Sequence, residues 1–120
     1  MQISLKGTNI QILESTREYV DRKLVRLVEK LLVSGSGSEA LSLSIEVERT
    51  TKHHKKGKIF RAEAELALGK KVLYAEEFGE TLNEAIDLLE ESLEREIKHF
   101  KGRSRALMLK SARRLKGTGQ

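Results

Sequence analysis

The sequence predicts an α+β domain with the element order β-α-β-β-β-α, a four-stranded sheet with two helices packed on one face. Three observations indicate this fold. Four short segments alternate apolar with polar residues, two longer segments repeat apolar residues every three or four positions, and none of the 120 residues is proline. A chain of this length is large enough for one domain with a single hydrophobic core.

The first strand and the first helix come from the first third of the chain. Ile3 and Leu5 alternate with polar residues, so a short, half-buried strand is expected to open the chain. Ser15 followed by Glu18 is a capping-box pattern, which predicts that the first helix starts there. The buried face of this helix is predicted from its apolar repeat. That repeat consists of Val20, Leu24, Leu27 and Leu31.

Three more strands are expected after the S-G-S-G-S segment at 34–38, which we interpret as a flexible connector. Apolar and polar residues alternate over 41–48 and again over 60–68, as in strands with one buried face. Gly69 with the following lysine predicts a tight hairpin turn, and 71–76 form the fourth strand.

The polar positions of these strands predict an open sheet face on the side away from the helices. A helix between the first two strands allows them to pair in parallel through a right-handed crossover, and the others follow as an antiparallel meander. The predicted members of the open face are Ser42, Ser44, Glu46, Glu48, Arg61, Glu63, Glu65 and Glu76. Because this face is mainly acidic and has few aromatic residues, it is unsuited to stacking bases or holding phosphates.

A long amphipathic helix is predicted over 81–116. Thr81 followed by Glu84 is a second capping box and marks the start of the helix. One apolar stripe follows, made of Leu82, Ile86, Leu89, Leu93, Ile97 and Phe100. We predict that 1–101 form the α+β domain and that 102–120 form a basic C-terminal extension, whose leucines suggest a helix formed against a partner.

The net charge of +5 conceals an uneven distribution along the chain. Residues 1–97 contain 15 Lys and Arg against 18 Asp and Glu, whereas 98–120 contain eight basic residues and no acidic one. Such a segment favours a polyanion because binding releases condensed counterions, so nucleic acid is the first partner to consider. A solvated tail without a ligand is the alternative interpretation.

Basic side chains of the two helices are the candidate nucleic-acid contacts. If the helices pack side by side, these side chains form a two-helix cationic ridge; alternatively, some pair with Glu29, Glu94 or Glu96, where an exposed pair contributes little. The candidates are Lys23, Arg26 and Lys30 in the first helix, Lys56 and Lys58 before the third strand, and Arg95, Lys98, Lys101, Arg103 and Arg105 toward the C-terminus.

Several classes of function lack the residues that they need. The chain has no cysteine, and the adjacent His53 and His54 have no obvious carboxylate partner, so neither a metal nor a cofactor is expected. Exposed carboxylates without a pocket and the lack of a G-x-S-x-G motif argue against an enzyme acting on a small-molecule substrate. No apolar run approaches the roughly 20 residues of a membrane span, and a cytoplasmic location is expected.

Three segments of the chain carry a more specific pattern. They are I-Q-I-L-E-S-T-R-E-Y-V-D-R-K-L at 10–24, H-K-K-G-K-I-F-R-A-E at 54–63, and A-E-E-F-G-E-T-L-N-E-A-I-D-L-L-E-E-S-L-E-R-E-I-K at 75–98. In this order and spacing they resemble the ribosome hibernation promoting factor family, in its short form of the ribosome-associated inhibitor A or sigma-54 modulation protein type. The resemblance runs from residue 1 to about residue 103.

This resemblance implies a β-α-β-β-β-α fold related in shape to double-stranded RNA-binding domains. It also implies binding to the small ribosomal subunit at the decoding region, where the protein occupies the sites of messenger and transfer RNA and keeps idle ribosomes inactive. A monomer is expected, because this chain ends too soon for the C-terminal dimerisation domain of long family members. The ribosomal RNA contacts implied by the matching family positions are Lys23, Arg26, Arg95, Lys98, Lys101 and Arg103. Lys56 and Lys58 are also implied, but by a weaker match.

Two other functions stay open from the residues alone. One is a general double-stranded RNA-binding module that does not inhibit ribosomes. The other is a protein-interaction domain that binds a transcription factor through the acidic sheet face.

Overall fold

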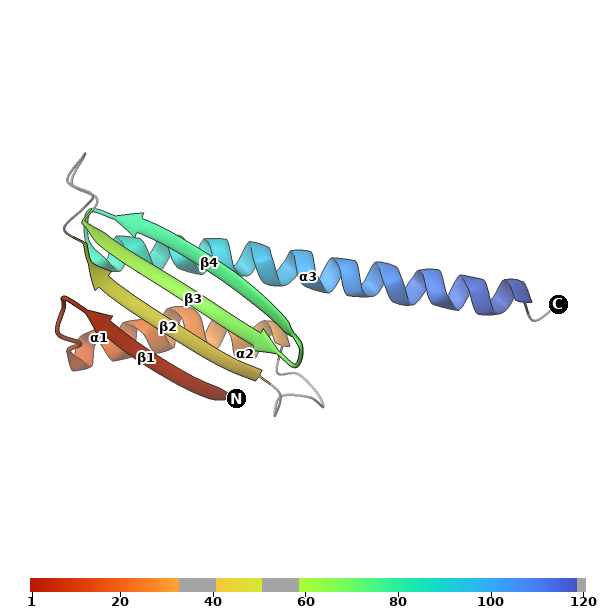
Figure 1. Cartoon of the computed structure of the whole chain (residues 1–120), viewed down its shortest axis with the longest axis horizontal. Coiled ribbons are helices and arrows are strands. Elements are labelled where there is room, and N and C mark those ends of the chain that lie inside the picture. Colours follow the sequence, from red (N-terminus) through yellow and green to blue (C-terminus); the bar gives the residue numbers. More distant parts are fainter. Residues whose placement is uncertain (33–40, 51–58, 119–120) are drawn as a thin grey trace.

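The computed structural model describes residues 1–32, 41–50 and 59–118, except for the side chains of 104–118. Its elements are β1 (Gln2–Thr8), α1 (Glu14–Val20), η1 (Asp21–Val25), α2 (Arg26–Leu32), β2 (Leu41–Arg49), β3 (Phe60–Leu68), β4 (Lys71–Gly79) and α3 (Leu82–Thr118). Because α1, η1 and α2 follow one another without a break, the predicted β-α-β-β-β-α order is confirmed (Figure 1). The predicted connector at 34–38 lies outside the described residues.

The sheet has the predicted topology. Its strand order is β1-β2-β3-β4, with β1 parallel to β2 and the other pairs antiparallel. Gly69 forms the predicted hairpin turn with a φ of 62°, a backbone conformation that glycine adopts without steric cost. The last strand continues past its predicted end at Glu76 to Gly79.

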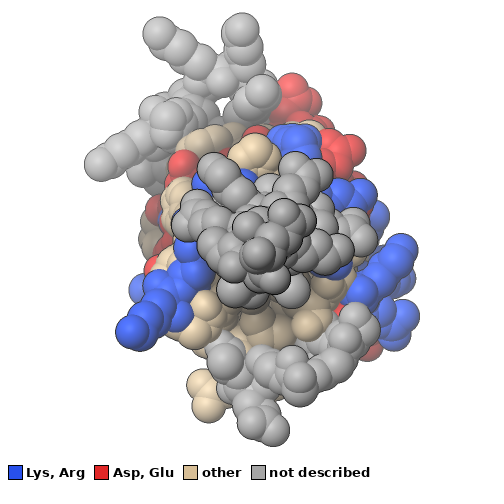
Figure 2. All heavy atoms as spheres, turned by 90° about the vertical axis from the view of Figure 1, so that its right-hand side faces the viewer, with Lys and Arg blue, Asp and Glu red and all other residues tan. Residues whose placement is uncertain are grey.

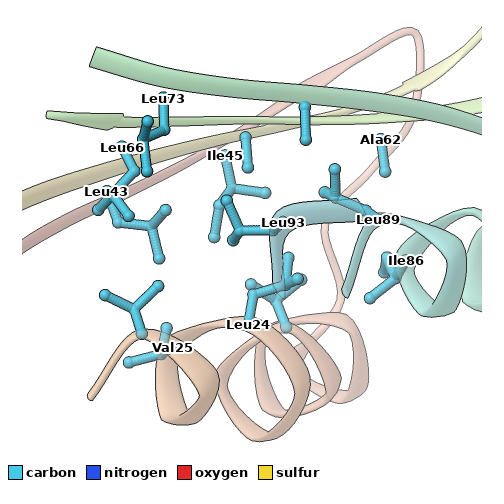
Figure 3. Close-up of a cluster of buried hydrophobic side chains, with 14 of the residues drawn as sticks. Leu24, Val25, Leu43, Ile45, Ala62, Leu66, Leu73, Ile86, Leu89 and Leu93 are labelled. Atoms are coloured by element: carbon cyan, nitrogen blue, oxygen red, sulfur yellow. The ribbon is translucent and has the colours of Figure 1, made fainter. Parts of the chain in front are cut away.

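Two helical segments, α1–η1–α2 and α3, cover one face of the sheet as a single layer and run in the same direction (Figure 1). The core lies between them and the sheet, as Figure 3 shows. Its fully buried large side chains come from all three parts of the fold: Leu24, Val28, Leu43, Val47, Leu66, Ile86, Leu89, Leu93 and Ile97. The apolar stripe predicted for the last helix is therefore the surface that α3 packs on the sheet.

Small side chains of β3 and β4 lie beneath α3. Ala62 and Ala64 are completely buried and Ala75 nearly so. Figure 3 shows Ala62 of the sheet directly above Leu89 of α3, with Ile86 farther from the sheet on the same helix. A sheet surface of alanines lets a helix with long aliphatic side chains approach closely without leaving voids. This packing fixes the position of α3 and therefore of the charged residues on its outer side.

The first helix begins differently from the prediction. Its N-cap is Leu13, without any side-chain hydrogen bond. The Leu13 carbonyl accepts the backbone N–H groups of Thr16 at 3.0 Å and Arg17 at 3.1 Å. The predicted capping box at Ser15 is therefore wrong, because Ser15 lies inside the first turn, two positions too late for its side chain to act as the cap.

One turn of π-helix changes which side chains of this helix face the core. The turn is η1, and such a turn holds an extra residue, which shifts the buried face along the sequence. Val20 and Leu24 are buried as predicted, but Val28 takes the place expected for Leu27, which is only half-buried. Leu31, also predicted on this face, likewise stays at the edge of the core.

The start of α3 agrees with the sequence. The backbone N–H of Glu84 donates to Thr81 Oγ1 at 3.0 Å, which confirms Thr81 as the capping residue. The Glu84 carboxylate accepts the backbone N–H of Glu80 at 3.3 Å. From there α3 continues without interruption to Thr118 and projects beyond the end of the sheet (Figure 1), so that the molecule is 64 Å long. The boundary between a domain at 1–101 and an extension stays a prediction.

Two glycines provide a test of this packing. A Cβ at Gly79 would lie 2.6 Å from the backbone nitrogen of Ala85, in the first turn of α3, whereas a Cβ at Gly102 would meet nothing within 4 Å. We expect Gly79→Ala to reduce the free energy of unfolding by about 1–3 kcal/mol through overpacking. The matched variant Gly102→Ala should raise it by up to about 1 kcal/mol through helix propensity. Urea denaturation of both variants measures this, and equal effects would contradict the close approach at Gly79.

Candidate nucleic-acid interface

The open sheet face is organised around one arginine. Arg61 projects from β3, and its side chain is only 14% exposed. Its guanidinium donates to four glutamates of three strands: Glu48 at 2.7 Å and Glu46 at 3.0 Å on β2, Glu63 at 2.6 Å on its own strand, and Glu76 at 2.8 Å on β4. Four carboxylates around one cation leave this cluster with an excess of negative charge.

Hydrogen bonds keep the charges of this cluster in place. Burial on its own would lower the pKa of Arg61, but the hydrogen bonds to Glu48 and Glu63 outweigh it and raise the pKa. A hydrogen bond from the Thr8 hydroxyl at 2.5 Å is the main reason why the pKa of Glu46 lies below its ordinary value. Both shifts favour the charged forms of Arg61 and Glu46, and the excess of negative charge in the cluster repels phosphates.

An aromatic side chain shares the open face with these charges. Tyr74 is half exposed, and its hydroxyl donates to Glu63 at 3.0 Å. Partial burial and this hydrogen bond raise the pKa of Tyr74 to about 12. The predicted acidic charge of this face is thus confirmed. Tyr74 was not among its predicted members, although the alternation of buried and exposed residues over 71–76 places it there.

The opposite side of the molecule presents the predicted cations of the helices. Because α3 lies beside the first helical segment, its basic residues come next to those of α2, as predicted for a cationic ridge. Figure 2 views the molecule from the end at which α3 projects and shows lysine and arginine on both sides of that end. The exposed members of this cationic ridge are Arg26, Lys30, Arg95, Lys98, Lys101 and Arg103.

Lys23 is held differently from the exposed members of the ridge. Its ammonium lies 3.4 Å from Asp87 and 3.5 Å from Glu90, both on α3, and Glu90 contributes most to raising its pKa. The Tyr19 hydroxyl also donates to Asp87. Lys23 therefore connects the first helical segment to α3 and has its charge balanced, which makes it a weaker candidate for a phosphate contact.

Two members of the cationic ridge have partners that a phosphate can replace. Lys98 lies 2.7 Å from Glu94, one turn earlier on α3, and both side chains are well exposed, so the pair contributes little to stability. Lys101 donates to the Leu31 carbonyl at 2.9 Å, close to the last residue of α2. A cation held at that helix end is favourably placed against the helix dipole and stays open to solvent.

Arg95 is oriented by a polar contact on its own helix. Its guanidinium donates to Ser92 Oγ at 3.0 Å, and the Ser92 hydroxyl donates to Glu77 on β4. This chain of hydrogen bonds orients the guanidinium group of Arg95 while the residue stays exposed.

Three predicted contacts are not placed by the structure. Lys56 and Lys58 lie outside the described residues, as do the neighbouring His53 and His54. Arg105 lies in the helical backbone of α3, and its side chain is not described. The cation–aromatic contact of Arg22 with Tyr19, 5.2 Å from the ring centroid, was not among the predicted sites. Its sequence signal is the spacing of three residues, which places both side chains on one side of a helical turn.

Other kinds of site find no support in the described parts of the chain. Within them, no three His, Asp or Glu residues are grouped so that they could hold a metal ion. Their helices include none that is long and apolar enough to cross a membrane.

The fold and its charges define a class of protein: a small α+β domain whose cationic helix layer suits a polyanion and whose acidic sheet does not. The sequence model of the family described as Sigma 54 modulation protein / S30EA ribosomal protein matches residues 3–105. The chain belongs to this family, whose members are ribosome-associated proteins and not a family of enzymes.

Two solved structures are similar to this chain. One is the N-terminal domain of Protein Y from Thermus thermophilus, with 29% identity and a TM-score of 0.61 over 83% of this chain and 99% of that one. The other is a ribosomal subunit interface protein from Coxiella burnetii, with 20% identity and a TM-score of 0.65 over 85% of this chain and 99% of that one. The second similarity is one of fold alone.

Proposed function

We propose that this protein is a ribosome hibernation factor that binds the small ribosomal subunit at the decoding region and inhibits translation there. The observation that carries this proposal is the separation of charge between the two faces, in a member of a ribosome-associated family. Exposed cations on two adjacent helices bind phosphates, and the acidic sheet then faces away from RNA. Occupied in this way, the subunit cannot accept messenger and transfer RNA.

The mechanism needs no chemical step. Contacts between phosphates and the exposed ridge, which includes Arg26, Lys98 and Arg103, supply affinity through counterion release. The rigid spacing of α2 and α3, fixed by their shared core, supplies the selection of a site with matching phosphate positions. The cytoplasm, where ribosomes work, is the compartment in which this function would be carried out.

Co-sedimentation with isolated small subunits tests this proposal. We expect the full chain to sediment with small subunits at low salt and to dissociate as salt rises, with a log–log slope of several units that reports the phosphate contacts. Bound protein should also prevent messenger and initiator transfer RNA from binding, and it should inhibit translation in vitro. Failure to associate at low salt would contradict the proposal.

A duplex RNA of unrelated sequence is the control that separates site selection from general affinity. We expect clearly weaker binding to this duplex than to the small subunit at the same salt. Equal affinities would instead favour a general double-stranded RNA-binding module.

A further inference from the structure

A groove on the side of the molecule away from α3 has no part in the proposed function. It lies between β1, an edge strand of the sheet, and the helical segment formed by α1 and η1. Its volume is about 340 Å³, and its floor is apolar, with Ile3, Leu5 and Val25 among the lining residues. Ile3 is 48% exposed, which is a large fraction for an isoleucine beside the core. The groove is therefore an uncovered apolar surface next to an unpaired strand edge.

The rim of this groove carries an excess of negative charge. Glu14, Glu18 and Asp21 line it from α1 and η1, against a single cation, Arg17. An apolar floor with an acidic rim matches an amphipathic, basic helix, which brings apolar side chains to the floor and cations to the rim.

The chain itself contains a segment of this chemistry. Residues 104–118 hold five basic residues but no acidic one, and they also hold Leu107, Met108, Leu109 and Leu115. Their backbone is the helical end of α3 that projects beyond the sheet with no other element beside it (Figure 1). At 1.5 Å per residue this segment is about 22 Å long, and the α1–η1 side of the groove is about 17 Å long, so the lengths agree.

The topology excludes the groove of the same molecule as the binding site for this segment. The groove lies at the β1 edge, whereas α3 packs on β3 and β4 and leads away from the sheet as one continuous helix. A second molecule is under no such constraint. We infer that the projecting end of α3, residues 104–118, docks into the β1–α1 groove of a second copy of this chain, so that the protein self-associates.

The expected interaction is weak and partly electrostatic. A short helix in a shallow groove buries less than the roughly 1,200 Å² of a stable interface, so association is expected only at high concentration. Opposite charges at the rim predict that it weakens as salt rises. This differs from the expectation of a monomer drawn from the sequence, and it does not depend on the proposed function.

Sedimentation velocity of the nuclease-treated full chain tests the inference. We expect the average mass to rise above the monomer mass of 13.6 kDa with increasing protein concentration and to fall back with salt. The double variant Glu14→Lys/Glu18→Lys should weaken self-association roughly tenfold, since it reverses two rim charges. The matched variant Glu65→Lys/Glu91→Lys makes the same change of charge on the open sheet face and on α3, and it should self-associate normally.

A mixture of two defective variants gives the sharpest result. A chain ending at Arg103 keeps the core residues that are buried in the described part of the chain but lacks the projecting segment, and circular dichroism verifies its fold. At a protein concentration near the dissociation constant of the native chain, this shortened chain and the Glu14→Lys/Glu18→Lys variant should each stay largely monomeric. Their mixture should form a complex through the one intact groove and the one intact segment. A monomer under all conditions, self-association by the shortened chain, or no complex in the mixture would each overturn the inference.

Discussion

Reversal of Lys98, Lys101 and Arg103 to glutamate is expected to abolish binding to the small subunit at physiological salt. These residues are exposed on the outer side of α3, and none belongs to the apolar stripe. Each lost phosphate contact lowers the salt slope by about one, so the triple variant should lose about three units of slope and roughly a hundredfold or more in affinity.

The fold should survive this triple substitution. The contacts that it removes are an exposed ion pair with Glu94 and one hydrogen bond to the Leu31 carbonyl. Such contacts stabilise by about 1 kcal/mol or less each. Circular dichroism and urea denaturation check the fold, and filter binding to small subunits at several salt concentrations measures the loss.

A matched control reverses the same number of exposed cations elsewhere. Arg49 at the end of β2, Lys70 in the hairpin turn and Lys71 at the start of β4 are exposed and belong to neither helix. We expect their reversal to lower the affinity far less, through the change of net charge alone. Equal losses in the two triple variants would show that binding responds to total charge and not to the helix layer.

Replacement of Arg61 by methionine is expected to cause the largest loss of stability that a single surface-facing residue can produce here. The substitution leaves four glutamates close together with no cation between them. Removing one partner of a buried ion pair costs about 3–5 kcal/mol, and the partial exposure of these carboxylates reduces this to about 2–4 kcal/mol. Urea denaturation at neutral pH measures the difference in the free energy of unfolding.

The pH dependence of the stability loss in Arg61→Met distinguishes repulsion among the carboxylates from lost packing of the arginine side chain. In the native protein the pKa of Glu46 is lowered, so its contribution to stability is present above its ordinary pKa of 4.5 and is lost as the pH falls through the lower folded value. Without Arg61, protonation relieves repulsion among the carboxylates, so the deficit of the variant should shrink as the pH falls toward 4.5. A deficit that does not change with pH would mean that lost packing of the arginine stem dominates.

A lysine at position 61 is the control for the geometry of the guanidinium. Arg61→Lys keeps the positive charge but cannot donate to four carboxylates at once. We expect its stability to lie between those of the native protein and Arg61→Met. Full stability would indicate that charge alone is needed at this position.

Periodicity predicted the elements well and failed where the backbone departs from regular geometry. The two-residue alternation of the strands placed Leu43 and Ile45 in the core and Glu46 on the open face, as the structure has them. The buried positions predicted from the apolar repeat of the first helix were wrong after Leu24, because a single π turn shifts the buried face by one residue. The residues at 21–25 carry no glycine or proline that would indicate such a turn, so the local sequence pattern did not predict it.

For the candidate site too, the sequence predicted some features, and only the structure showed others. The positions of the basic residues along the helices predicted a cationic ridge, and the structure brings Lys30, Lys98 and Lys101 to one side. The sequence did not predict that Lys23 has its charge balanced by Asp87 and Glu90, because these partners are more than sixty residues away along the chain. Long-range pairing decides which cations are available to a ligand.

The sequence by itself determined the order of elements, the sign of charge on each face and the membership of the family, because each follows from residue types at local spacings. Only the tertiary structure decided that Arg61 holds four glutamates of three strands, that Lys23 connects two helices, and that α3 leads its basic end away from the groove at β1. These features arise from strand register and helix packing, which bring together residues that no local pattern relates.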